Sequence, residues 1–290
     1  TDFLETAVSL TQGEGETKQY GFVPDIYEPN DLLDFVAQLA GSDLIDDSTT
    51  PASIRFIDPA VTTAVRWFTD LTTEYAVKPV FLTNTGSSDG LAEHRERELL
   101  IGNGRAAMWS ESGRFAGGLT VVSGDAAQRP ANVGLVPLPA APDGSRPGGY
   151  QATTGYFISA AAAAPQACWQ WIAYLTEQPN LGTGLPARRE TAKSAAYRQY
   201  VGSERAAAYL FTVEKATRPS FFQSFAEYPW LGVASIWLAT AYDQIIRENV
   251  SVETALEQAQ VTADSFQACL AASDGFYNRQ QQQRCYEALP

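Results

Sequence analysis

Apolar residues recur at helical spacing in several segments of the chain. The first twelve residues, TDFLETAVSLTQ, predict a helix with Thr1 as its N-cap. The segment DLLDFVAQLAG predicts a second helix, which stops at Gly41. A third is expected to begin at Asp58-Pro59, because aspartate is a favoured N-cap and proline is tolerated at the first helical position. Its apolar face consists of Val61, Val65, Phe68 and Leu71.

Short apolar runs between these helices predict strands. They are KQYGFVP (ended by Pro24), AAMW, VGLVPLP near residues 133–139, and YQATTGYFISA. The chain is mainly helical from Ala192 onward. Helix and strand signals alternate without an internal repeat. The Pro/Gly-rich stretch Pro139 to Gly149 is the best candidate boundary, and a weaker one lies near Leu185 to Thr191.

The stretch GNGRAA at 102–107 contains the G-x-G-x-x-A pattern of dinucleotide-binding domains. That fingerprint requires a strand before the glycines and a helix after them. Here the predicted helix LAEHRERELLIG precedes the glycines and the apolar AAMW follows. We therefore interpret the glycines as a helix C-cap and a turn into a strand, and expect no nucleotide cofactor.

The three cysteines divide into one and two. Cys168 lies in QACWQWIAYLT, on an i, i+3, i+4, i+7 apolar stripe, so a buried, unpaired packing thiol is expected. Cys269 and Cys285 are separated by polar sequence near the C-terminus. A segment with few apolar residues is one that a disulfide would hold in place, but spacing alone supports two reduced thiols equally well.

Charge and composition narrow the function. The chain of 290 residues is long enough for one large domain or two smaller ones. Its 20 basic and 33 acidic residues give a net charge of −13, which disfavours nucleic acid and anionic membrane surfaces as partners. Its apolar runs are all shorter than the roughly 18 residues of a membrane span, so no direct membrane span is expected.

Catalytic signatures are weak. The single histidine, His94, lies among charged neighbours in a predicted helix, so neither a two-histidine metal site nor a serine triad is expected. We therefore predict no metal. Asp46-Asp47, Glu28 with Asp31, and Glu111 are nominal carboxylates for a glycosidase, but 33 carboxylates produce such pairs by chance.

Aromatic residues are the more informative group. Several stand in turn-like polar contexts, namely Tyr27, Trp109, Tyr150, Tyr228 and Trp230. An aromatic ring beside carboxylate, amide and guanidinium groups suits a sugar, whose flat face stacks while its hydroxyls form hydrogen bonds. The alternative is that each ring covers a core. Trp67 and Trp169, within apolar helices, are expected to pack internally.

Taken in order, these segments resemble the extracellular solute-binding proteins of ABC importers, in the family 1 group that includes maltose-binding protein. The resemblance covers nearly the whole chain. The matching segments are TDFLETAVSLT with KQYGF, DPAVTTAVRWFTDL, GLAEHRERELLIGNGRAAMW, VGLVPLPA, GGYQATTGYFIS, ACWQWIAYLTEQP, LPARRE and VSVETALEQAQVTAD. It implies a helix-rich α/β fold of the type II periplasmic-binding-protein class, in which two lobes close around a ligand at a hinge.

The resemblance also implies site residues, carried over one at a time. Glu28 and Asn30 lie where the group has a glutamate and a sugar-contacting tyrosine, so Asn30 offers hydrogen bonds and Tyr27 compensates for the lost ring. Glu111 and Arg114 follow Met108 where the group often has a stacking tryptophan. Trp237 lies close to another stacking position, although Trp230 is expected to be the more exposed ring. The resemblance therefore implies that the chain binds a solute without catalysis and delivers it to the permease subunits of an ABC importer.

The resemblance further implies how the chain is divided. Residues 1–139 would form the first part of the C-terminal lobe, 140–191 the hinge crossing and a returning segment of the N-terminal lobe, and 192–290 the second part of the C-terminal lobe. The start of the N-terminal lobe would lie upstream of Thr1, with a lipid anchor placing the protein in the periplasm or at the cell surface. A chain with half a cleft is expected to bind its solute weakly or not at all, and to expose an apolar face.

Two other classes stay open. One is a carbohydrate-active hydrolase that uses Glu111 and a second carboxylate. The other is a structural or interaction role, in which an oligomer covers the exposed apolar face.

Overall fold

A computed structural model describes residues 2–24, 28–40, 44–80, 90–110, 133–140, 144, 146, 155–181, 184–217 and 227–289. The first half of the chain carries the strands, with the elements α1 (Asp2–Leu10), η1 (Gly15–Thr17), β1 (Tyr20–Val23), α2 (Glu28–Leu39), β2 (Ile45–Asp46), β3 (Ser53–Ile54), α3 (Pro59–Thr73), α4 (Gly90–Gly102) and β4 (Ala106–Trp109). The second half is helical, with α5 (Pro165–Glu177), α6 (Arg189–Ala192), α7 (Ala195–Val201), α8 (Ser203–Lys215), η2 (Pro229–Leu231), α10 (Gly232–Glu248), α11 (Val252–Ala272) and α12 (Arg279–Glu287).

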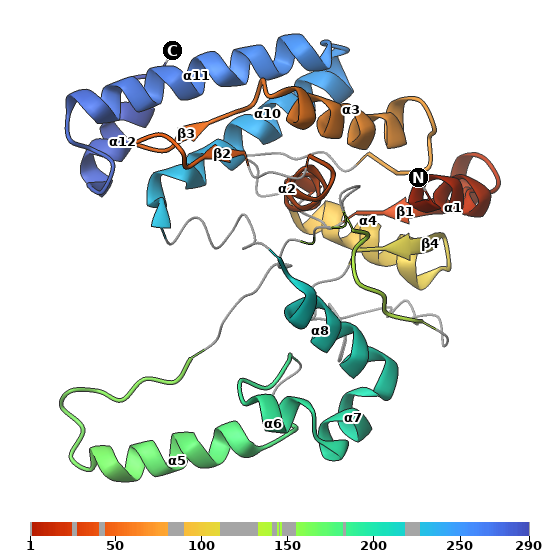
Figure 1. Cartoon of the computed structure of the whole chain (residues 1–290). Helices are drawn as coiled ribbons and strands as arrows, with labels where there is room; N and C mark the ends of the chain where they lie inside the picture. Colours follow the sequence, from red (N-terminus) through yellow and green to blue (C-terminus); the bar gives the residue numbers. More distant parts are fainter. Residues whose placement is uncertain are drawn as a thin grey trace.

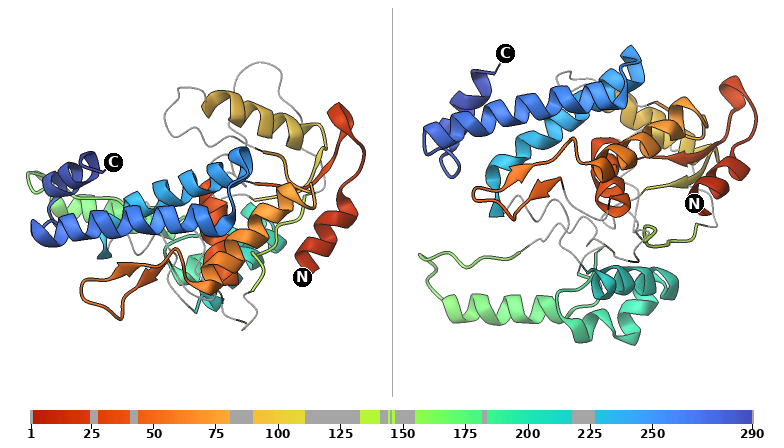
Figure 2. Two further views of the ribbon diagram at one scale, coloured as in Figure 1. Left: turned by 90° about the horizontal axis from the view of Figure 1, so that it is seen from above. Right: turned by 45° about the horizontal axis from the view of Figure 1, so that its top comes forward.

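The elements form a main body and a separate group of helices (Figure 1). The main body contains everything up to β4 together with η2 to α12, so the two ends of the sequence pack together. Its larger apolar cluster is built from α1, β1, α2, α3, α10, α11 and the β2–β3 hairpin, and a smaller one lies between β1, α4 and β4. Helices α5 to α8 lie below this body in Figure 1 and in the right-hand view of Figure 2, and residues 155–181 and 184–217 contribute no side chain to the larger cluster. The lobe boundaries predicted at 139/140 and 191/192 remain a prediction.

The main body contains a parallel pair of strands, β1 and β4. Tyr20 pairs with Ala106, Phe22 with Met108 and Val23 with Trp109. Helix α4 precedes β4, and Gly104 turns the chain between them with φ +69°. Helix before the glycines and strand after them is the predicted order, and it differs from the order that a dinucleotide fingerprint needs.

Strand β1 packs closely on α1 because residue 21 has no side chain. A Cβ atom at Gly21 would lie 1.9 Å from the carbonyl oxygen of Ala7. The strand therefore approaches the helix backbone at a distance that only glycine allows.

Helix α3 begins as the sequence predicts. The Asp58 carboxylate accepts a hydrogen bond from the Ala60 amide at 2.8 Å, and Pro59 occupies the first turn. The predicted apolar face, Val61, Val65, Phe68 and Leu71, is fully buried.

We expect Asp58→Ala to lower the free energy of unfolding by about 1 kcal/mol, because it leaves an amide of the first turn without its side-chain acceptor. Urea denaturation followed by circular dichroism measures this loss. Asp58→Asn keeps an acceptor at the same position and is the matched control. A loss as large in the asparagine variant as in the alanine variant would contradict the capping role.

Helix α5 differs from its prediction. It forms at the expected residues, but none of its side chains is buried, and Cys168 is an exposed free thiol rather than a packed one. Trp169 and Trp171 are 57% and 60% exposed, although Trp169 was expected to pack internally. The spacing of the apolar residues predicted the stripe on α5. A stripe becomes buried only when another element packs against it, and no described element packs against this stripe. Trp67, in contrast, packs against Phe3 and Phe35 as expected.

Two predicted strands are also absent from the described residues. Residues 133–140 are irregular in the structure, and so are residues 155–159 of the second predicted strand, whose residues 150–154 lie outside the described structure. A strand is completed by backbone hydrogen bonds to a neighbour, and neither segment has a paired strand beside it within the described part of the chain. The apolar runs therefore predicted more strands than the described residues contain.

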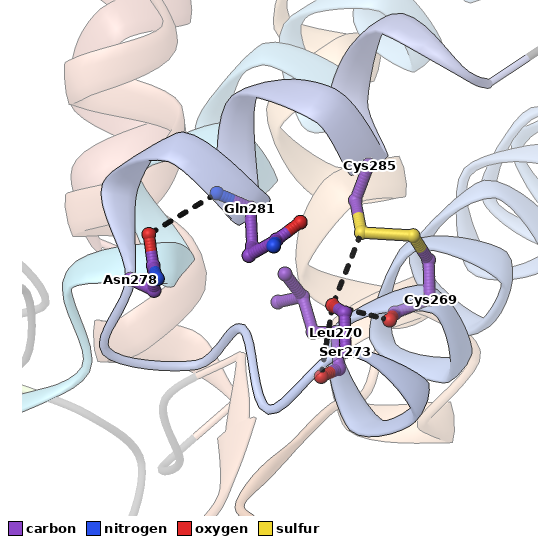
Figure 3. The surroundings of a disulfide bond; sticks show 6 residues. All are labelled: Cys269, Leu270, Ser273, Asn278, Gln281 and Cys285. Atoms are coloured by element: carbon purple, nitrogen blue, oxygen red, sulfur yellow. Dashed lines mark hydrogen bonds between the residues drawn. A yellow bond between two sulfur atoms is a disulfide. The ribbon is translucent and has the colours of Figure 1, made fainter.

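The C-terminal helices are joined by a disulfide (Figure 3). The sulfur atoms of Cys269 in α11 and Cys285 in α12 are bonded at 2.02 Å. Asn278 caps α12 by accepting hydrogen bonds from the amides of Gln280 and Gln281. Of the two states that spacing left open, the structure adopts the bonded one. Among the described residues, no helix combines the length and apolarity needed to cross a membrane.

Candidate functional site

The candidate site is the edge where β1 and β4 end. Both strands run in the same direction, so their carboxyl ends meet, and the ladder continues as the Ser110 amide donates to the Val23 carbonyl at 3.2 Å. Pro24 follows β1 and Ser110 follows β4, and α2 begins at Glu28. In open α/β sheets, ligands bind outside the carboxyl ends of the strands. This edge is therefore where a solute site is expected.

Arg97 of α4 reaches this edge with its side chain. Its side chain is 5% exposed. Nε donates to the Pro24 carbonyl at 2.9 Å, and Nη2 donates to the Ser110 carbonyl at 2.6 Å. Nη1 donates to the Glu98 carboxylate at 3.0 Å, which supplies the counter-charge that a buried guanidinium needs. One side chain thus contacts the backbone at the ends of both strands.

A second polar contact joins α2 to the same edge. The Ser110 hydroxyl donates to the Asp31 carboxylate at 2.6 Å, and Asp31 is 7% exposed. A hydrogen bond to a buried, charged acceptor is stronger than one between neutral groups. The first turn of α2 is therefore tied to the residue that follows β4.

The predicted ligand residues divide according to their place in the structure. Trp109 lies at the end of β4, half-buried against the small cluster of Val23, Leu100, Ile101 and Ala106. Glu28 and Asn30 lie in the first turn of α2, next to Asp31, and their side chains lie outside the described structure. Tyr27, Glu111, Arg114 and Tyr150 also lie outside the described residues. The described chain thus brings Trp109 and the start of α2 to one edge.

The aromatic residues near η2 are placed differently from the prediction. Trp230, expected to be the exposed ring, is 2% exposed and packs edge-to-face against Phe276 at 5.5 Å. Trp237 is 7% exposed and packs against Phe266 at 5.4 Å. Both rings belong to the core made by α10 and α11, so in this structure neither offers a free face for stacking.

Tyr228 is half-buried beside this core. Desolvation, together with the carboxylates of Glu227 and Asp47, raises the pKa of Tyr228 above its usual value. The phenol is therefore a neutral hydrogen-bond donor at neutral pH. Its role as a ligand residue remains a prediction.

Arg97 and Ser110 were missed by sequence reasoning. The segment HRERE around Arg97 has the composition of a solvated helix face. One signal was available, since Arg97 lies three and four residues before Leu100 and Ile101, which are 4% and 1% exposed. Residues at that spacing share a helix face, so Arg97 lies on the buried side of α4.

Comparison with known proteins identifies the fold. No protein-family model matches the chain, and no curated protein matches it. Among solved structures, the maltose/maltodextrin-binding domain MalE from Bdellovibrio bacteriovorus, bound to maltotriose, has a TM-score of 0.58 at 18% identity, over 91% of this chain and 64% of its own. UgpB from Mycobacterium tuberculosis, in complex with glycerophosphocholine, has a TM-score of 0.59 at 17% identity, over 87% and 58%. The ABC substrate-binding protein Lmo0181 from Listeria monocytogenes, in complex with cycloalternan, has a TM-score of 0.60 at 14% identity, over 92% and 63%.

The chain therefore spans between 58% and 64% of the length of these three structures. The similarity extends over most of this chain and is shared by several proteins of one kind. The fold prediction is confirmed: the chain has the helix-rich α/β fold of ABC-importer solute-binding proteins, over the part of that fold which it spans.

Proposed function

We propose that this chain binds a carbohydrate or sugar-like solute without catalysis, for delivery to the permease subunits of an ABC importer outside the cytoplasm. The observation that carries the proposal is the shared fold, which covers 91% and 92% of this chain in proteins solved with maltotriose and cycloalternan. Both of those ligands are carbohydrates. A protein with this fold was also solved with glycerophosphocholine, so the proposed class extends to small polar solutes.

The residues at the carboxyl edge of β1 and β4 support this class of ligand. Trp109 supplies an indole ring, and the adjoining segments supply Glu28, Asn30, Glu111 and Arg114 in the sequence. An aromatic face with carboxylate, amide and guanidinium neighbours matches a sugar ring and its hydroxyls. The lobe division at 139/140 and 191/192, and closure at a hinge between lobes, belong to the same proposal.

Isothermal titration calorimetry with maltotriose and glycerophosphocholine tests the proposal. We expect weak, saturable binding of at least one of them, and Trp109→Ala is expected to lower that affinity about tenfold through loss of ring contact. Trp169→Ala, on the exposed face of α5, is the matched control and should leave the affinity unchanged. Equal affinity in the two variants would contradict the role of Trp109.

Incubation with aryl glycosides and oligosaccharides tests the catalytic alternative. A binding protein releases each sugar unchanged. Turnover that disappears in Glu111→Gln would overturn the proposal in favour of a hydrolase.

A further inference from the structure

We propose that Arg97 is a positioning residue of the ligand site, which fixes the spacing between the carboxyl ends of β1 and β4. The inference rests on the proposed function for its biological meaning. Its physical basis is the pair of hydrogen bonds from one guanidinium to the carbonyls of Pro24 and Ser110.

These carbonyls belong to the residues that directly follow β1 and β4. Residues 25–30 continue from Pro24, and residues 111–114 continue from Ser110, so the predicted ligand residues lie within six residues of the two contacts in the sequence. At the edge itself, the ladder has the bond from the Ser110 amide to the Val23 carbonyl. Terminal ladder bonds open most easily, because local stability is lowest at element ends. Arg97 adds a second connection between the same two strands.

Arginine suits this role better than lysine. The two carbonyls belong to segments far apart in the sequence, and they are reached by different nitrogens of one rigid, planar group. An ammonium group is a single point, and it does not reproduce a fork with a fixed spacing. The third contact, to Glu98, balances the charge and contacts neither strand.

The Asp31–Ser110 bond extends the arrangement to α2. Because Ser110 receives Arg97 at its carbonyl and donates from its hydroxyl to Asp31, a single residue joins α4, β4 and α2. The start of α2, with Glu28 and Asn30, is thereby held relative to Trp109. Arg97 acts on the ligand only through these neighbours.

Amide hydrogen exchange on the full chain tests the inference without a ligand. In Arg97→Lys we expect the Ser110 amide to exchange about tenfold faster, because the ladder end opens locally. The Phe22 amide, which donates to the Val77 carbonyl, reports opening of the body and should keep its wild-type rate. Glu96→Gln, at an exposed position of the same helix, leaves the hydrogen bonds of Arg97 in place, so it is the matched control and should keep both rates.

Two outcomes would overturn the positioning role. One is a wild-type Ser110 exchange rate in Arg97→Lys, and the other is equal acceleration at Ser110 and Phe22, which would make Arg97 a general stabiliser. If Arg97→Lys does not fold, Ser110→Ala decides: it removes the Asp31 contact but keeps the Arg97 contact. The exchange rate of the residue-110 amide should then rise by less than about threefold, and a tenfold rise would refute the positioning role.

Titration with maltotriose separates this inference from the proposed function. If the wild type binds maltotriose, Arg97→Lys should weaken binding about tenfold with an unchanged thermal midpoint, and unchanged binding would refute the role in the site. If the wild type does not bind it, the proposed function fails for that sugar. The exchange rates then decide the positioning role by themselves.

Discussion

Replacing Phe68 by alanine is expected to lower the free energy of unfolding by about 3–5 kcal/mol, the usual cost of removing a fully buried phenyl ring. Phe68 has no exposed surface and lies on α3 at the centre of the main body. Its ring centroid is 5.6 Å from that of Phe35 and 5.9 Å from that of Tyr242. The ammonium of Lys78 lies 5.0 Å from its centroid. The ring therefore joins α2, α3 and α10, which are distant in the sequence.

Urea denaturation followed by circular dichroism measures this loss. Phe157→Ala is a matched control, because that ring is 93% exposed and its removal should change the free energy of unfolding by less than about 0.5 kcal/mol. Phe68→Leu keeps most of the buried volume, so its loss of unfolding free energy should lie between those of Phe68→Ala and Phe157→Ala. A loss below about 1 kcal/mol for Phe68→Ala would show that α3 is not seated on α2 and α10 as described.

Removing the disulfide is the second large effect. We expect the double variant Cys269→Ser/Cys285→Ser to lose about 3 kcal/mol of unfolding free energy, because the bond closes a loop between residues 16 apart. Without it, the unfolded chain gains conformational freedom at this point. Cys285 is 2% exposed, so a serine hydroxyl there would also be buried.

The measurement is denaturation of the variant beside the oxidised wild type. The loop between the cysteines includes Phe276, which packs on Trp230, so local opening should also redshift the Trp230 emission. Cys168→Ser is the matched control, since that thiol is free and exposed, and it should change stability by less than about 0.5 kcal/mol. Equal stability of the double variant and the wild type would contradict the expectation.

Local pattern determined most of the elements. Asp58-Pro59 starts α3 because the cap and the proline act within one turn, and the buried face of α3 follows from the spacing of its apolar residues. The glycine turn before β4 was also predicted from local sequence. A helical pattern precedes Gly104 and an apolar run follows it within a few residues. The order of these segments also identified the fold that the comparisons show.

Of the candidate site, the sequence placed Trp109 at the end of a strand but missed Arg97 and its contacts. Arg97 and Pro24 are 73 residues apart, and no local pattern encodes a hydrogen bond over that separation. Nothing in the local sequence marks Ser110, because its hydroxyl meets the Asp31 carboxylate, at 2.6 Å, only in the folded chain.

The sequence by itself therefore determined several of the helices, the start of α3, and the class of fold that the segments form. Only the tertiary structure decided which apolar faces are covered. The stripe on α5 and the face of α3 have similar spacing, yet Trp171 on the stripe is 60% exposed and Phe68 is fully buried. Burial depends on the surface that packs against a side chain, and for Phe68 and Trp230 that surface comes from parts of the chain far away in sequence or lying beyond a turn. The spacing of apolar residues predicts which face of a helix is apolar, but the tertiary structure determines which element packs against that face.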